Sequence, residues 1–166
     1  SDKNIEADKV PANAIMVTGA VHHYLIAQGI RTDANLIIET GLARDSHQVA
    51  VLIGFGATCV YPYLAYDVID DLVATGELLG DPIQARVNFR KGLDKGLLKI
   101  LSKMGISTIV SYRGAQLFEA VGLSEELVNL CFIGVQSRIK GATFADLAAD
   151  QAQLAANAFK RRAALD

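Results

Sequence analysis

The sequence lacks most of the residues that assign a chain to a class at once. It contains no tryptophan, only three prolines and only two cysteines. Cys59 and Cys131 lie far apart, each in an apolar stretch, so we expect two buried thiols in a reducing compartment rather than a disulfide. No group of cysteines has the spacing of a zinc or iron–sulfur site, and we expect no metal in this segment.

The sequence also lacks a large excess of charge of one sign and long apolar runs. The net charge of −2 provides no basic excess for binding nucleic acid. Each apolar run is interrupted by Arg, Asp, Glu or His before it reaches the ~18 residues of a membrane-spanning helix. Residues 1–14 are polar and acidic and match neither a signal nor a transit peptide. The composition, 51% hydrophobic and 20% charged residues, is typical of a folded chain. Its length of 166 residues corresponds to about one domain.

Short apolar segments alternate with helical segments. We expect strands at residues 14–19, 35–40, 57–61 and 106–111. We expect helices at residues 20–29, 46–56, 64–75, 82–104 and 114–122. This alternation is typical of an α/β fold with a parallel sheet. About four strands fit half of a (β/α)8 barrel or a small open sheet; we favour the half-barrel-like piece, because a closed barrel needs about 250 residues.

Helix-capping residues define the remaining boundaries. The expected caps are Asp45 or Ser46, Asp81 before Pro82, Ser124, and Thr143. Ser124 begins a short helix over 125–132, and a glycine-punctuated connector follows. Thr143 then begins an alanine-rich C-terminal helix whose last turn is basic. We therefore divide the chain into an α/β segment, 1–141, and a helical linker or docking element, 142–166.

Polar residues follow each expected strand, at the end of the sheet where ligands of α/β proteins bind. They are Thr18 and Gly19, Glu39 to Gly41, Tyr61 to Tyr63, and Ser111 to Gly114. The candidate strand-end site consists of Glu39, Arg44, His47, Ser111, Tyr112 and Arg113. Arg44 and Arg113 have the planar guanidinium that clamps a carboxylate or phosphate. The alternative is an ordinary ion pair of Arg113 with Glu39, with the hydroxyls capping helices.

The histidines leave two interpretations open. His22 and His23 are adjacent on one helix, so their side chains diverge by roughly 100° and cannot chelate as an i, i+4 pair does. His47, in a first helical turn, is either a base or anion contact or a packing residue. The glycines of 54–58 lie between a helix and the next strand, which excludes a dinucleotide-binding loop. Lysines 91, 95, 99 and 103 form one solvated helix face.

Three segments resemble one known family. They are "GAVHHYLIAQGIRTDANLIIETGLARDSHQVAVLIGFGATCVYPYLAYDVI", "KGLLKILSKMGISTIVSYRGAQLFEAVGL" and "GVQSRIKG". They resemble the large (alpha) subunit of glutamate synthase, and more narrowly the C-terminal part of its central domain, up to the junction with the FMN-binding domain. The resemblance extends from about Asp2 to Gly141.

The resemblance implies a parent enzyme that transfers the amide nitrogen of glutamine to 2-oxoglutarate and reduces the adduct through FMN to glutamate. The parent would carry FMN and an iron–sulfur cluster, but this segment would hold neither and would contribute no catalytic residue. It would connect the glutaminase and FMN domains and be inactive alone. Apart from the resemblance, the unpaired edges of an open four-stranded sheet predict that the isolated chain forms a symmetric homodimer. The expected location is the cytoplasm, or a plastid for a plant or algal parent. The alternative function is a stand-alone α/β module that binds a small anion.

Overall fold

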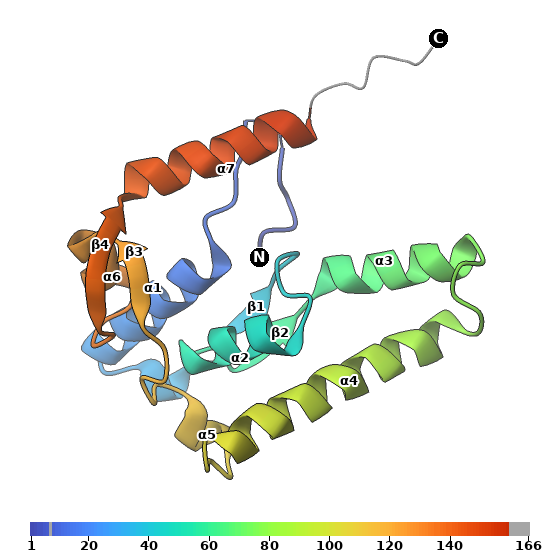
Figure 1. The fold of residues 1–166 in the computed structure, drawn as a ribbon, viewed down its shortest axis with the longest axis horizontal. Coiled ribbons are helices and arrows are strands. Elements are labelled where there is room, and N and C mark those ends of the chain that lie inside the picture. Colours follow the sequence, from blue (N-terminus) through green and yellow to red (C-terminus); the bar gives the residue numbers. More distant parts are fainter. Residues whose placement is uncertain (7, 160–166) are drawn as a thin grey trace.

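The computed structural model describes residues 1–6 and 8–159, and its first half is organised around a βαβ unit (Figure 1). The unit consists of β1 (Ile37–Glu39), α2 (Ser46–Gly54) and β2 (Cys59–Tyr61). The two strands pair in parallel, with Ile38 opposite Val60. The strands expected at 35–40 and 57–61, and the helix between them, are thus confirmed.

A second βαβ unit follows near the C-terminus of the described chain. It consists of β3 (Ala120–Leu123), α6 (Glu125–Cys131) and β4 (Ser137–Ala142). Its strands are also parallel, but the register is irregular on both sides of Val121. The α/β class and the parallel pairing are confirmed, although the four described strands form two two-stranded sheets instead of one.

Helices make up most of the remaining structure. They are α1 (Ala14–Ala27), the 3₁₀ turn η1 (Arg31–Asp33), α3 (Tyr63–Ala74), α4 (Pro82–Lys103), α5 (Ile109–Tyr112) and α7 (Phe144–Ala158). The expected caps are confirmed: the side chains of Asp45, Asp81, Ser124 and Thr143 each accept a backbone N–H at the start of a helix. The basic end of the last helix lies outside the described residues.

Two of the expected strands are wrong, and in both cases a cap explains why. Asn13 Oδ1 accepts the backbone N–H of Ile15 at 3.0 Å, so residues 14–19 begin α1 instead of forming a strand. Thr108 Oγ1 accepts the N–H of Ser111 at 3.3 Å, so the segment 106–111 leads into the single-turn helix α5. Local capping thereby overrides the apolar composition of both runs.

The short helix expected at 114–122 and the connector after residue 132 are also wrong. These segments supply β3 and β4. A side chain at Gly141 would collide with the backbone of Gly122, and Gly122 itself has a φ of +75°, which favours glycine. The glycines of these segments therefore permit close strand pairing, whereas the sequence pattern suggested turns.

The core consists of two clusters. The first surrounds α2 and includes Ala50, Leu52 and Leu101, and the second surrounds α6 and includes Leu127 and Phe132. Helix α1 contributes to both, because Ile15 packs against each cluster.

Only one cysteine matches its predicted environment. Cys131 is buried, and burial raises the pKa of its thiol, whereas Cys59 is exposed, so the prediction for Cys59 is wrong. Both thiols are free.

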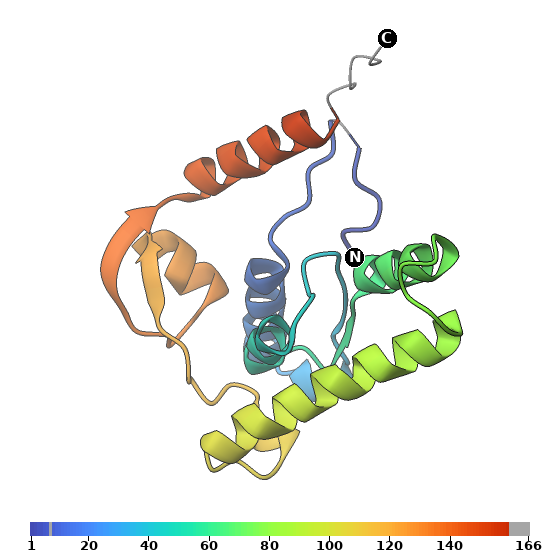
Figure 2. The ribbon, with the colours of Figure 1, turned by 45° about the vertical axis from the view of Figure 1, so that its right-hand side comes forward.

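The remaining helices extend outward. Helices α3 and α4 form a hairpin (Figure 1) in which Arg86 pairs with Asp70 and its guanidinium lies over the Tyr66 ring. Helix α7 lies on the opposite side of the molecule from α4 in both views (Figure 2), and none of its residues is buried. Among the described helices, none combines the length and the apolar character needed to cross a bilayer.

Candidate functional site

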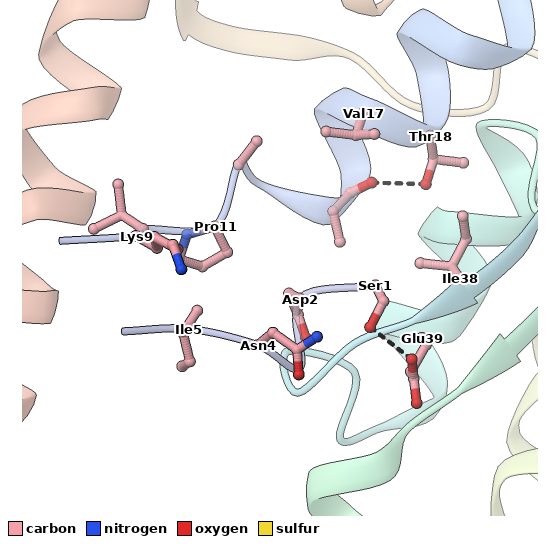
Figure 3. Close-up of a pocket in the computed structure, with 13 residues that line it drawn as sticks. Ser1, Asp2, Asn4, Ile5, Lys9, Pro11, Val17, Thr18, Ile38 and Glu39 are labelled. Atoms are coloured by element: carbon pink, nitrogen blue, oxygen red, sulfur yellow. Dashed lines mark hydrogen bonds between the residues drawn. The ribbon is translucent and has the colours of Figure 1, made fainter. Parts of the chain in front are cut away.

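The carboxyl end of the β1–β2 pair is covered by the first residues of the chain (Figure 3). The Asp2 backbone N–H donates to the carbonyl oxygen of Glu39 at 3.2 Å. The Asp2 carboxylate accepts the Thr40 hydroxyl at 2.5 Å and the Gly41 N–H at 3.0 Å. The Ser1 hydroxyl donates to Glu39 Oε2 at 2.6 Å. This end of the sheet is therefore acidic, and its acceptors are used by neighbouring donors.

A cavity of about 380 Å³ lies beside these contacts, between the N-terminal segment, α1 and β1 (Figure 3). Glu39 and Thr18 line it, and the Thr18 hydroxyl donates to the carbonyl oxygen of Ala14 at 2.6 Å. Next to Asp2, burial and the Asp2 charge raise the pKa of Tyr63 to about 12. No group of three or more His, Cys, Asp or Glu side chains in residues 1–6 and 8–159 is arranged to hold a metal ion.

Arg44 and His47 lie at the same end but point into solvent. Arg44 is exposed, and its backbone N–H donates to Gln48 Oε1 at 2.8 Å. His47 is exposed, with its ring edge-on to Phe118 at 6.4 Å between centroids. Neither side chain contacts Glu39 through any hydrogen bond or ion pair within the described chain.

Ser111, Tyr112 and Arg113 lie elsewhere. The Gly114 N–H donates to the carbonyl oxygen of Gly54 at 2.9 Å, which holds this segment at the C-terminal end of α2. Arg44 precedes the N-terminal end of the same nine-residue helix, roughly 13 Å away along its axis. The structure thus brings Glu39 together with Thr18 and Tyr63, but it does not bring Arg113 to Arg44 or to Glu39. The predicted ion pair of Arg113 with Glu39 is not formed between these described residues.

The three residues of this segment have different surroundings. The Ser111 hydroxyl is exposed and lies 2.8 Å from Thr108 Oγ1. Tyr112 is 2% exposed and belongs to the α2 core cluster. Arg113 is half-buried and follows the last residue of α5.

The C-terminal end of α2 lies near the amino end of the β1–β2 pair, and a basic cluster occupies this end. Arg31 donates three hydrogen bonds: Nε to His22 Nδ1 at 2.8 Å, Nη1 to the carbonyl oxygen of Ala34 at 2.6 Å, and Nη2 to that of Gly56 at 2.8 Å. Burial, followed by the charges of Arg31, His23 and Arg113, lowers the pKa of His22 to about 4. Burial and the charge of Arg113 also lower the pKa of Arg31. His22 is consequently neutral at pH 7.

Sequence reasoning missed Asp2 and Arg31. Asp2 has no motif around it and acts only because the chain folds back across β1. Arg31 has one usable signal: it lies between a helix-ending glycine and a strand, so it belongs to the amino end of the sheet. Asp33, two residues later, is the partner that sequence proximity would suggest, but Arg31 bonds to His22 and backbone carbonyls instead.

Comparison with known proteins agrees with the resemblance stated above. The profile of the glutamate synthase central domain matches residues 1–124. The chain is 43% identical over 152 residues to Glutamate synthase (NADH) of Schizosaccharomyces pombe, covering 90% of this chain and 7% of that protein. It is 41% identical over 171 residues to Ferredoxin-dependent glutamate synthase of Pyropia yezoensis, covering 96% of this chain and 11% of that protein.

A bacterial relative matches equally well. The chain is 40% identical over 141 residues to the Glutamate synthase (NADPH) large chain of Bacillus subtilis, covering 85% of this chain and 9% of that protein. In each case the chain spans only about a tenth of its relative's length. Because the central-domain profile covers most of the chain and the same domain-sized piece is found in each relative, this chain belongs to the glutamate synthase central domain family.

Proposed function

We propose that this chain is the C-terminal part of the central domain of a glutamate synthase large subunit, where it connects the glutaminase and FMN-binding domains. In this role it supplies no catalytic residue and is inactive alone. The parent enzyme transfers the amide nitrogen of glutamine to 2-oxoglutarate and forms glutamate, with FMN and an iron–sulfur cluster bound by other segments. Its location is the cytoplasm, or a plastid in a plant or alga.

The observation that carries the proposal is the exposed apolar surface of the two parallel sheets. Parallel sheets are normally covered on both faces, and a two-stranded sheet is marginally stable by itself. Here Ile37 in β1 is 67% exposed, Val121 in β3 is 65% exposed and Ile139 in β4 is 60% exposed. Such side chains are the ones that neighbouring domains cover in a longer chain.

Helix α1 supports the same interpretation. It is apolar on all sides, which is typical of a helix buried in a larger protein. Yet Val17, Val21 and Tyr24, spaced as one helical stripe, are exposed by 45%, 38% and 63%. A connecting domain with partners on several sides accounts for this stripe.

The division at residue 141 and the barrel relationship belong to this proposal. The succession β1, α2, β2, α3 provides two consecutive βα units, which is the repeat of a (β/α)8 barrel. Helix α7, without a buried residue of its own, is suited to be the linker or docking element within residues 142–166.

A chimeric enzyme tests the connecting role. The matching segment of the Bacillus subtilis large chain is replaced by this chain, and a matched control carries a glycine–serine linker of the same length. We expect glutamine-dependent glutamate formation in the first chimera and none in the control. A folded first chimera without activity, or an isolated chain that purifies with stoichiometric flavin or hydrolyses glutamine, would contradict the proposal.

Self-association of the isolated chain is a separate consequence. Exposed strand edges and apolar patches pair with further copies, most simply as a symmetric dimer. Light scattering after size exclusion should find a dimer for the full chain and a smaller dimeric fraction after truncation at Gly141. Monomers for both across the micromolar range would show that the exposed strands do not drive association.

A further inference from the structure

A small cavity lies at the amino end of the β1–β2 pair, beside the basic cluster. Its volume is about 50 Å³. His22, Tyr112 and Gln116 line it together with apolar side chains, among them Phe55 and Phe118. Since a water molecule needs about 10–15 Å³ measured in this way, the cavity has room for one anionic group and not for a whole dicarboxylate.

The donors around this cavity lack acceptors. Tyr112 is 2% exposed, and its hydroxyl has no hydrogen-bond partner among the described residues. Arg113 does not line the cavity itself but lies between Tyr112 and Gly114, which do; its Nε–H is buried and has no partner in the described part of the chain. An unpaired buried donor costs about 1–3 kcal/mol, so the Nε–H of Arg113 indicates that an acceptor belongs here, within reach of the free Tyr112 hydroxyl.

His22 adds a third donor. Its Nδ1 accepts the Nε–H of Arg31, so the proton of the neutral ring is on Nε2. No residue that the structure describes accepts a hydrogen bond from Nε2. The tautomer that Arg31 imposes therefore presents an N–H and not a lone pair.

The cluster also has excess positive charge. Neither Arg31 nor Arg113 forms an ion pair within residues 1–6 and 8–159. The C-terminal end of α2, which Gly114 and Arg31 approach through Gly54 and Gly56, contributes about half a negative charge. More than one positive charge therefore remains without a compensating negative charge. An anion would neutralise this charge, whereas a water molecule would not.

The backbone beside the cavity is strained. Gln116 has φ of 53°, and it is the one non-glycine residue with positive φ in the described chain. Strain of this kind occurs at ligand clamps, where the surrounding structure maintains it.

We propose that the amino end of the β1–β2 pair binds a small oxyanion, a carboxylate or phosphate group, through Arg113, His22 and the Tyr112 hydroxyl. The anion supplies only acceptors, which matches a site that supplies only donors. This site shares Tyr112 and Arg113 with the predicted one, but it lies at the amino end of the strands and does not include Glu39, Arg44 or His47.

Thermal unfolding of the full chain tests the site. Sodium acetate, sodium phosphate and sodium chloride are compared at equal ionic strength, so that general screening is the same. We expect acetate and phosphate to raise Tm in a saturable manner with half-saturation in the millimolar range, and chloride to leave it unchanged. Equal behaviour in all three salts would overturn the proposal.

Three variants separate binding from folding. Arg113→Met should weaken the anion response at least tenfold without lowering Tm in chloride, because it removes an uncompensated charge. Tyr112→Phe should weaken the response several-fold, again without loss of Tm in chloride, because no existing hydrogen bond is removed. Arg138→Met, which changes an exposed arginine of β4, should respond like the wild type. Responses that do not differ between Arg113→Met and Arg138→Met would overturn the proposal.

The chimeric large chain distinguishes two sources of the anionic group. An anion response in both the isolated chain and the chimera indicates a free oxyanion. A response in the isolated chain that disappears in the active chimera indicates a carboxylate side chain of a neighbouring domain. A response in neither would overturn the proposal.

Discussion

The two ends of the β1–β2 pair have opposite polarity, although they are only three residues apart along each strand. At the carboxyl end, the acceptors of Asp2 and Glu39 are satisfied by donors of the same chain. At the amino end, Arg31 is satisfied, but Arg113 and Tyr112 retain unpaired donors. A strand-end cluster can thus be internally complete or incomplete, and the incomplete one is where an external group is expected.

The largest effect should come from closing the space at the amino end. Gly56 has φ of +120° and contacts the His22 ring, so Gly56→Ala adds backbone strain and a clash. We expect a loss of about 3 kcal/mol in the free energy of unfolding, measured by urea denaturation. Gly76→Ala, at φ of +78° in open space, should lose only about 1–2 kcal/mol. Equal losses would show that Gly56 does not pack on His22.

Removing the satisfied arginine should come next. Arg31→Met breaks three hydrogen bonds from one guanidinium, and we expect a loss of about 2 kcal/mol in urea denaturation. Arg44→Met changes an arginine whose side chain is exposed, and it should stay within about 0.5 kcal/mol of the wild type. A loss for Arg44→Met as large as for Arg31→Met would reverse the contrast between the two ends.

The carboxyl end should respond more weakly. Asp2→Asn keeps the size of the side chain but replaces one carboxylate oxygen by an NH2 group. This group cannot accept a hydrogen bond, so the contact with either the Thr40 hydroxyl or the Gly41 N–H is lost. We expect a loss of about 1 kcal/mol in the free energy of unfolding, measured by urea denaturation. Asp33→Asn, a matched change at an exposed carboxylate, should cost less than about 0.5 kcal/mol. No difference between the two variants would mean that the N-terminal segment does not stabilise β1.

Acid should weaken the amino end. Because the folded-state pKa of His22 is about 4 and its ordinary value is 6.5, the unfolded chain binds more protons between these pH values. Stability due to His22 is complete above pH 6.5 and is lost as the pH falls to 4. Because solvent screens the half-exposed ring, we expect His22 to lower the free energy of unfolding by only about 1 kcal/mol over this pH range. His22→Gln should flatten this slope of stability against pH; an unchanged slope in that variant would contradict the assignment.

The helix boundaries were predictable because they depend on local chemistry. Asp45, Asp81, Ser124 and Thr143 cap helices through contacts within three residues, and a sequence displays such contacts directly. The apolar runs at 14–19 and 106–111 were predicted wrongly because a short apolar run fits a strand or a buried helical turn equally well. Their caps, Asn13 and Thr108, are also local, and they decide for the helix in both cases.

The candidate site followed from those strand assignments. Glu39 and Tyr63 were placed correctly because β1 and β2 were, whereas Ser111 to Arg113 were assigned to the wrong end because the segment before them is not a strand. The contact of Asp2 with Thr40 and the contact of Arg31 with Gly56 join residues 38 and 25 positions apart. No local pattern encodes them.

The pKa of His22 tests the basic cluster most directly. A pH titration of the histidine ring signals by NMR, with His22 assigned from the His22→Gln variant, measures it in the intact chain. The account predicts a value of about 4 in chloride, because burial and the nearby arginines disfavour the charged ring. It also predicts a rise when phosphate binds, since a bound anion favours the charged ring. A value at or above 6.5 without phosphate would contradict the account, because it would require a carboxylate beside His22 and a cluster that is already complete.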